Sequence, residues 1–193
     1  MTLKQMLIAL ILLIPVSMAH AQEADYTKII TQFYNDEVSS WSLDTALLSA
    51  IRVRNVIDGG LTPEDILAKN KQWRAEVKTD THPLVDSVVN TAASDFLRHR
   101  VVDAGGTITE VFIMDANGLL VAAASATSDY WQGDKPKYSE TFGKGIGALH
   151  VSELDVDESM GVYQIQMSHT ITDPQTDAAI GAITVGVIAD ALY

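Results

Sequence analysis

The spacing of hydrophobic residues changes at Gly105-Gly106, and this change constrains the fold more than any other feature of the chain. Before the glycine pair, apolar side chains recur every three or four residues, which is the spacing of amphipathic helices. After it, apolar and polar residues alternate, most clearly from Val162 to Thr170, which is the spacing of a β-strand. A run of helices followed by a run of strands predicts an α+β domain.

Four helices are expected before the glycine pair. The apolar spacing predicts an amphipathic helix over 23–38 and a second helix that Ser42 or Asp44 caps. The sequence Thr62-Pro63-Glu64-Asp65 predicts the start of a third helix, with a cap, a proline and acids in the first turn. His82-Pro83 is expected to begin the fourth. The pattern leaves open whether the first two helices are one continuous helix.

About five strands are expected after the glycine pair, in an antiparallel sheet that packs against the helices. The first two are joined through Asp115-Ala116-Asn117-Gly118, and Asn-Gly is typical of hairpin turns. The segment from Glu153 to Glu158 is interpreted as an acidic turn. The five expected strands are Ile108 to Met114, Leu119 to Ala124, Ala148 to Val151, Val162 to Thr170 and Ala179 to Ile188.

The first 21 residues are interpreted as a cleavable signal peptide. Lys4 supplies a positive charge, 6–16 is apolar, and Ala19-His20-Ala21 is a small-x-small cleavage site. The apolar run is shorter than the roughly 20 residues of a comfortable membrane span, although an uncleaved anchor remains the alternative. We therefore expect a periplasmic protein, from a Gram-negative bacterium, with a helical region over 22–106 and a sheet region over 107–193 in one structural domain.

Composition and motifs argue against several function classes. The net charge of −12 disfavours binding to nucleic acid and to anionic lipid surfaces. The chain has no cysteine, so an oxidising compartment would give it no disulfides. Its histidines lack paired metal-site spacing, and the acids of 153–158 lack the order of a calcium loop. Neither a P-loop nor a G-x-S-x-G motif occurs, so we expect no metal, no cofactor and no enzyme activity.

The stretch T-S-D-Y-W-Q-G-D-K-P-K-Y, residues 127–138, is the segment most typical of a binding site. Aromatic faces beside free charges suit a loop that clamps a small polar molecule. Tyr163 and His169 are added because they share a strand face with apolar residues, so that face is expected to point inward. The predicted ligand-binding residues are Asp129, Tyr130, Trp131, Asp134, Lys137, Tyr138, Tyr163 and His169.

Each candidate also has a purely structural interpretation. The aromatic side chains could pack as core, and Asp129 could cap a local turn. Asp134 and Lys137 have the spacing of an exposed ion pair, whose contribution is small. A lone histidine on an inward strand face, such as His169, is more often a core residue than a ligand group.

Three parts of the chain are diagnostic together: V-F-I-M-D-A-N-G-L-L-V, the T-S-D-Y-W-Q-G-D-x-x-K-Y loop, and the pair V-Y-Q-I-Q-M-S-H-T and A-I-G-A-I-T-V-G-V. They resemble an extracytoplasmic PAS-like sensor domain of the Cache, or PDC, family in its single-module, stand-alone secreted form. The resemblance is best over 109–190. It implies a long N-terminal helix, a five-stranded antiparallel sheet, and a pocket between one sheet face and the loops for a small carboxylate, amino acid or amine.

Two functions remain open at this point. The first is a periplasmic small-molecule-binding protein that senses its ligand, or presents it, to a separate membrane receptor or kinase. Its N-terminal helices would also offer a surface for a homodimer. The second is an accessory module that binds no ligand, because its own side chains fill the PAS-like pocket.

Overall fold

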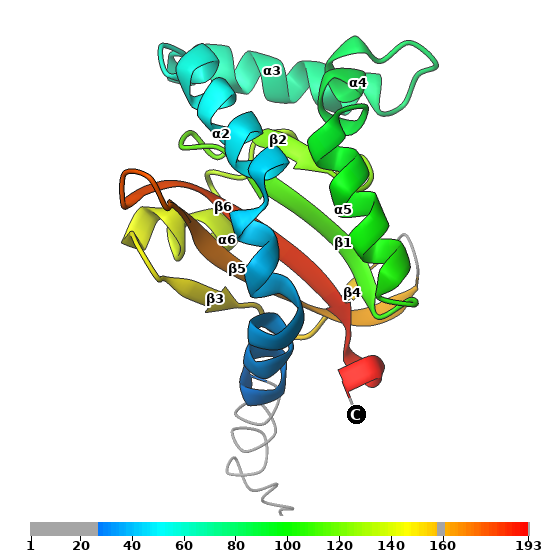
Figure 1. Cartoon of the computed structure of the whole chain (residues 1–193). Helices are drawn as coiled ribbons and strands as arrows, with labels where there is room; N and C mark the ends of the chain where they lie inside the picture. The colour runs from blue at the N-terminus through cyan, green and yellow to red at the C-terminus, as the bar shows by residue number, and fades with distance from the viewer. Residues whose placement is uncertain (1–26, 158–160, 193) are drawn as a thin grey trace, which may run out of the picture.

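The computed structural model describes residues 27–157 and 161–192, which form helices and one antiparallel sheet (Figure 1). The α+β class expected from the sequence is therefore confirmed. The predicted signal peptide at 1–21 lies outside the described residues. Within the described ranges, no helix is both long enough and apolar enough to cross a membrane.

The N-terminal segment is helical but changes its winding along its length. Residues 27–33 are α-helical, and they continue into a π-helical turn, η1 (Tyr34–Val38), and a 3-10 turn, η2 (Ser39–Leu43). Asp44 is extended, and its carboxylate accepts hydrogen bonds from the first N–H groups of α2 (Thr45–Asp58). The first two predicted helices are therefore separate, because the capping residue between them leaves the helical conformation.

The next helices begin where the sequence indicates, with one correction. The α3 helix (Pro63–Glu76) starts at a capping box in which Thr62 and Asp65 exchange hydrogen bonds. The single helix predicted from His82-Pro83 is wrong, because it is two helices, α4 (Pro83–Val89) and α5 (Ala92–Asp103). The chain turns extended at Thr91, whose hydroxyl caps α5 by accepting from the Ser94 N–H.

The described part of the sheet has six strands, in place of the five expected. The order is β2-β1-β6-β5-β3, and β4 pairs with β5 beside β3. The additional strand, β4, occupies the segment predicted as an acidic turn, because its backbone pairs with residues 162–164. The strands are β1 (Ile108–Met114), β2 (Leu120–Ala123), β3 (Leu149–Val151), β4 (Asp155–Asp157), β5 (Val162–Asp173) and β6 (Ala178–Ile188).

The predicted hairpin between β1 and β2 is present. Gly118 has φ 76°, a conformation that glycine adopts without steric cost. The chain then runs through the loop 124–135 to two short helical turns, α6 (Pro136–Ser139) and η3 (Phe142–Lys144). A third turn, η4 (Ala189–Leu192), follows β6.

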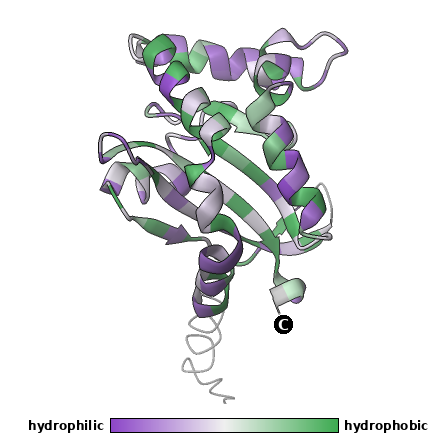
Figure 2. Cartoon of the chain, in the orientation of Figure 1, coloured by the Kyte–Doolittle hydropathy of each residue, from purple (hydrophilic) through white to green (hydrophobic). Residues whose placement is uncertain are grey.

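Both faces of the sheet are covered. Ile113 and its neighbours on alternate positions pack with α2 and α5, in a cluster that includes Ile51, Leu97 and Ile183. Successive side chains of a strand point to opposite faces, and Phe112 accordingly belongs to a second cluster with residues from α3, α4 and the loop. Figure 2 shows the result: the central strands β1 and β6 are hydrophobic over most of their length, whereas α3 is mainly hydrophilic.

Candidate ligand-binding site

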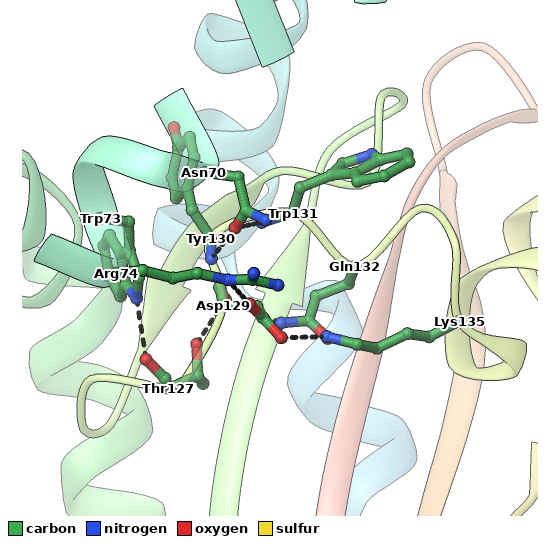
Figure 3. Close-up of polar contacts among 9 residues, drawn as sticks. All are labelled: Asn70, Trp73, Arg74, Thr127, Asp129, Tyr130, Trp131, Gln132 and Lys135. Atoms are coloured by element: carbon green, nitrogen blue, oxygen red, sulfur yellow. Dashed lines mark hydrogen bonds and ion pairs between the residues drawn. The ribbon is translucent and has the colours of Figure 1, made fainter. Parts of the chain in front are cut away.

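The loop between β2 and α6 is held by side chains of α3 (Figure 3). Asn70 Oδ1 accepts hydrogen bonds from the backbone N–H groups of Tyr130 at 2.9 Å and Trp131 at 3.1 Å. The Trp73 indole N–H, one turn along α3, donates to the Thr127 carbonyl at 2.8 Å. These bonds satisfy backbone groups that most loop residues would leave to water, so the loop has a defined conformation.

Asp129, the predicted anchor for a ligand ammonium, is already bound to two cations of the protein. Arg74 pairs with one carboxylate oxygen, and Lys135 Nζ lies 2.7 Å from the other. Partial burial acts to raise the pKa of Asp129, but the hydrogen bonds from Lys135 and Arg74 outweigh it and hold the pKa below its ordinary value. Asp129 is therefore an ionised link between α3 and the loop.

The three aromatic residues of the predicted binding segment 127–138 pack as structure. Tyr130 is fully buried, its ring centroid lies 5.3 Å from that of Trp73, and its hydroxyl accepts a hydrogen bond from Arg54. Burial raises the pKa of Tyr130 to about 12. The indole N–H of Trp131 and the hydroxyl of Tyr138 each donate to a backbone carbonyl of the β1–β2 turn, at 3.0 Å and 2.6 Å. Their polar atoms therefore hold the loop against the turn.

A cavity of about 420 Å³ lies between this loop and the sheet, on the face opposite α2 and α5. Phe112 gives it an apolar wall, and most other lining side chains are polar or charged. The lining comes from β1, the loop, α6, β4 and β5, so segments distant in the sequence meet around one space. The residues that matter for its chemistry are Thr109, Glu110, Asp129, Lys137, Gln164 and Gln166.

Two side-chain hydrogen bonds cross the central strand β6 at the cavity. Gly186 of β6 pairs with Glu110 of β1 on one side and with Gln166 of β5 on the other. Above it, the Thr109 hydroxyl donates to Gln164 Oε1 at 2.6 Å, and the Gln166 amide donates to Glu110. These bonds leave the amide nitrogen of Gln164 as a donor and the amide oxygen of Gln166 as an acceptor for other groups.

Glu110 and Lys137 bring opposite charges to the cavity, and no ion pair joins them. Burial raises the pKa of Glu110, while Lys137 and the hydrogen bond from Gln166 act in the opposite direction. Burial also lowers the pKa of Lys137, against the attraction of Glu110. Lys137 Nζ lies 5.3 Å from the centre of the Phe112 ring. Both groups have lost part of their hydration, so a charged partner would stabilise each of them.

The remaining sequence candidates lie outside this cavity. Asp134 is exposed. Tyr163 is 59% exposed at one end of β5, so the expectation that its whole strand face points inward is wrong there. His169 does point toward the helical layer, with its ring centroid 5.0 Å from that of Tyr34. Among the eight predicted residues, Asp129 and Lys137 are brought to the cavity, and ligand contact by any of the eight stays a prediction.

Sequence reasoning missed Glu110, Gln164 and Gln166. The two glutamines alternate with Ile165 and Met167, and such an alternation predicts that the apolar side points inward and the polar side faces water. The available signal was β6, whose nearly continuous apolar run is typical of a strand covered on both faces. Polar residues beside such a strand are enclosed, so they indicate a polar cavity.

Other hollows lie beside this cavity and elsewhere on the chain. One of about 790 Å³ shares Lys137, Gln164 and Gln166 with the cavity and opens beside β3. Another, of about 510 Å³, lies between the N-terminal helical segment and the end of α5, where Arg100 is paired with Asp103 at 3.0 Å. In the described ranges, no group of three or more His, Asp or Glu could hold a metal ion.

Comparison with known proteins gives a fold but no sequence relative. No protein-family model matches the chain, and no curated protein matches it in sequence. The sensor domain of the V. cholerae histidine kinase DctB is 11% identical and has a TM-score of 0.50, over 91% of this chain and 57% of that one. This chain shares the PAS-like α+β fold of that sensor domain.

Two further structures are similar at lower scores. The ligand-binding domain of the Campylobacter jejuni chemoreceptor Tlp3, in complex with L-valine, is 13% identical with a TM-score of 0.42, over 86% of this chain and 64% of that one. The ligand-binding domain of the Pseudomonas aeruginosa PAO1 amino acid chemoreceptor PctC, in complex with GABA, is 14% identical with a TM-score of 0.42, over 76% of this chain and 59% of that one. This chain thus spans less than two thirds of the length of each structure.

Proposed function

We propose that this Cache-fold chain binds a small polar molecule in the cavity above Gly186, and that it senses this ligand or presents it to a separate membrane partner. The observation that carries the proposal is the placement of Glu110 and Lys137 in one cavity without an ion pair between them. The shared fold with the DctB sensor domain supports a sensory role. The leader predicted at 1–21 supports a periplasmic location.

The charges of the cavity define which small molecules it favours. An ammonium group would be attracted to Glu110, and a carboxylate to Lys137, through charge-assisted hydrogen bonds. The amide groups of Gln164 and Gln166 would add one donor and one acceptor. An amine or a carboxylate uses one end of this arrangement, whereas an amino acid uses both. Asp129 contributes indirectly, because its bonds to Arg74 and Lys135 fix the loop that closes the cavity.

A thermal-shift screen tests the proposal. The protein, unfolded and refolded to remove carried-over molecules, is screened against ethylamine, L-alanine, L-glutamate, L-lysine, acetate and succinate. A compound at about 100 times its dissociation constant adds roughly 2.7 kcal/mol of stability, which is several degrees for a domain of this size. We expect Glu110→Gln to reduce the shift caused by ammonium compounds and Lys137→Met to reduce the shift caused by carboxylates.

The matched control is Lys144→Met, because Lys144 is an exposed lysine whose partner is Glu140, at 3.6 Å. The compounds should raise the melting temperature of Lys144→Met as much as they raise that of the unmodified protein. If no compound stabilises the protein, or if Lys144→Met behaves as Lys137→Met does, the proposal fails.

One observation favours the accessory module as a second candidate. Tyr130 stacks on Trp73, and Tyr138 stacks on Phe142 with centroids 5.4 Å apart, so the protein's own aromatic residues fill the sheet face beside the cavity. Under this alternative the helical half would be the interaction surface, and the screen above would give no shift with any compound.

A further inference from the structure

Gly186 occupies the one position of β6 over which side chains of β1 and β5 meet. A methyl group at this position would lie closer than 3.0 Å to Thr109 Oγ1, Gln164 Oε1 and Glu110 Cγ. Real Cβ atoms essentially never make such contacts. The space that a side chain would need is therefore taken by the two hydrogen bonds that cross the strand.

The backbone does not require glycine here. Six glycines of the described ranges have positive φ, and Gly186 is not one of them. A glycine inside a strand also weakens the strand, because it adds conformational entropy to the unfolded chain and offers no side chain to pack. The room above the strand is what this residue provides.

A second glycine of β6 shows what a purely structural role looks like. A methyl group on Gly181 would collide with the backbone carbonyl of Met114, so that glycine permits two strands to approach. The three atoms nearest to a methyl group on Gly186 are all side-chain atoms of cavity residues, and none belongs to the backbone of a neighbouring strand. Alanine at Gly186 would therefore rearrange the cavity and keep the fold.

We infer that Gly186 is a positioning residue of the ligand site: its missing side chain lets Gln166 and Thr109 bond across β6, and so holds the Glu110 carboxylate in the cavity wall. The inference rests on the proposed function for its meaning. The charged groups that act on Glu110 in this position are Lys137 of α6, Lys135 of the loop and Asp157 of β4.

The test is a carbon-13 NMR titration of the Glu110 carboxyl group in Gly186→Ala, with the signal assigned by its loss in Glu110→Gln. A methyl group at Gly186 would push the Glu110 side chain away and break its hydrogen bond from Gln166, which favours the ionised form, so the pKa of Glu110 should rise. The best compound of the six-member panel should bind at least about tenfold more weakly. Gly60→Ala is the control, since no atom lies within 4 Å of a methyl group there.

A second variant protects the test against misfolding. Gln166→Met removes the amide that bonds to Glu110 and adds nothing to β6, so it should raise the Glu110 pKa as Gly186→Ala does. An unchanged Glu110 pKa in both variants overturns the inference, as does an unchanged affinity beside a changed pKa. The titration needs no ligand, so it separates this inference from the proposed function: a flat compound screen with a shifted Glu110 contradicts only the latter.

Discussion

At Asp115 the β1–β2 turn buries a carboxylate completely. One oxygen accepts hydrogen bonds from the N–H groups of Asn117 at 2.8 Å and Leu119 at 2.9 Å. The other oxygen has no hydrogen-bond partner among the described residues. Burial raises the pKa of Asp115 to about 6, and the nearby Asp58 carboxylate acts in the same direction. A turn that the sequence predicts from Asn-Gly thus contains a destabilising charge at neutral pH.

Replacing Asp115 with asparagine should remove that charge and keep the bonds to the turn. The folded pKa lies above the ordinary value of 3.8, so this group's stability contribution is complete below about pH 4 and is lost as pH rises through 6. The loss amounts to roughly 2–3 kcal/mol. Asp115→Asn should therefore be the more stable protein at pH 7.5, as measured by urea denaturation between pH 4 and 8.

The exposed Asp134→Asn serves as the control for this series, and its unfolding free energy should change with pH as that of the unmodified protein does. If the unfolding free energy of Asp115→Asn also keeps this pH dependence, Asp115 is ionised from pH 4 to 8 and the prediction is wrong.

At the scale of elements, two contacts join parts that the sequence leaves unconnected. The α3 helix fixes the loop through Asn70, and α2 is tied to the end of β5 by Arg52, which donates two hydrogen bonds of 2.7 Å to Asp173. The sequence predicts the start of α3 from a cap, a proline and acids in the first turn, but nothing local to α3 indicates which loop it touches.

Truncating Asn70 should loosen the loop without touching the cavity. Asn70→Ala leaves the buried N–H of Tyr130 and the partly buried N–H of Trp131 without their acceptor. Each such group costs about 1–3 kcal/mol. We expect a loss of roughly 2–4 kcal/mol of unfolding free energy in a denaturant titration. Asn70→Asp keeps the acceptor oxygen and should lose clearly less; an equal loss would mean that side-chain volume is what matters.

The ion pair between Arg52 and Asp173 should make the stability of the protein fall in acid. The hydrogen bonds from Arg52, then that from the Gln175 N–H, lower the pKa of Asp173 to about 2. A lowered carboxyl pKa gives stability above about pH 4 that is lost as pH falls through 2. Asp173→Asn should melt at a lower temperature at pH 6, and the gap to the unmodified protein should close toward pH 2.

Asp95→Asn, which breaks an exposed pair with Arg98 inside α5, is the control and should change the melting temperature little. A gap for Asp173→Asn that persists unchanged at pH 2 would contradict the assigned role.

The sequence predicts the elements better than the site, for a physical reason. Helix caps and the Asn-Gly turn are local, so Thr62 and Gly118 could be placed from their neighbours alone. The break between α4 and α5 at Thr91 is not predicted, because the apolar residues keep their helical spacing across it. The cavity depends on which sheet face is enclosed, and Gln164 and Gln166 have the same alternation whether water or a loop covers them.

At the scale of the whole molecule, β5 has side chains on both faces of the sheet, one toward the cavity and the other toward α2 and the N-terminal helical segment. Gln164 and Gln166 line the cavity, while Ile165 and Met167 pack in the helical layer on the other face. Two residues beyond Met167, on the same face, His169 lies against Tyr34 of the N-terminal helical segment. A change at the cavity therefore has a path of direct contacts to that segment.

Hydrogen exchange measured by mass spectrometry should detect this path. On saturation with the best panel compound, we expect protection to change in peptides covering 34–43 as well as in β5. His169→Ala should reduce the change in 34–43 and leave the change in β5. Protection that changes only in the loop 124–135 would show that the helical segment is not coupled to the cavity.

The π-helical turn η1 gives that coupling a mechanical form. A π turn contains one residue more than an α-helical turn, and Tyr34, its first residue, is the one that contacts β5. Converting η1 to α-helix would rotate residues 27–33 by about 100° relative to α2 and displace them along the axis by about 1.5 Å. Spin labels at Gln32 and Val53 would register that motion as a change in distance. Binding in the polar cavity would then be transmitted as a rotation of the N-terminal helical residues 27–33.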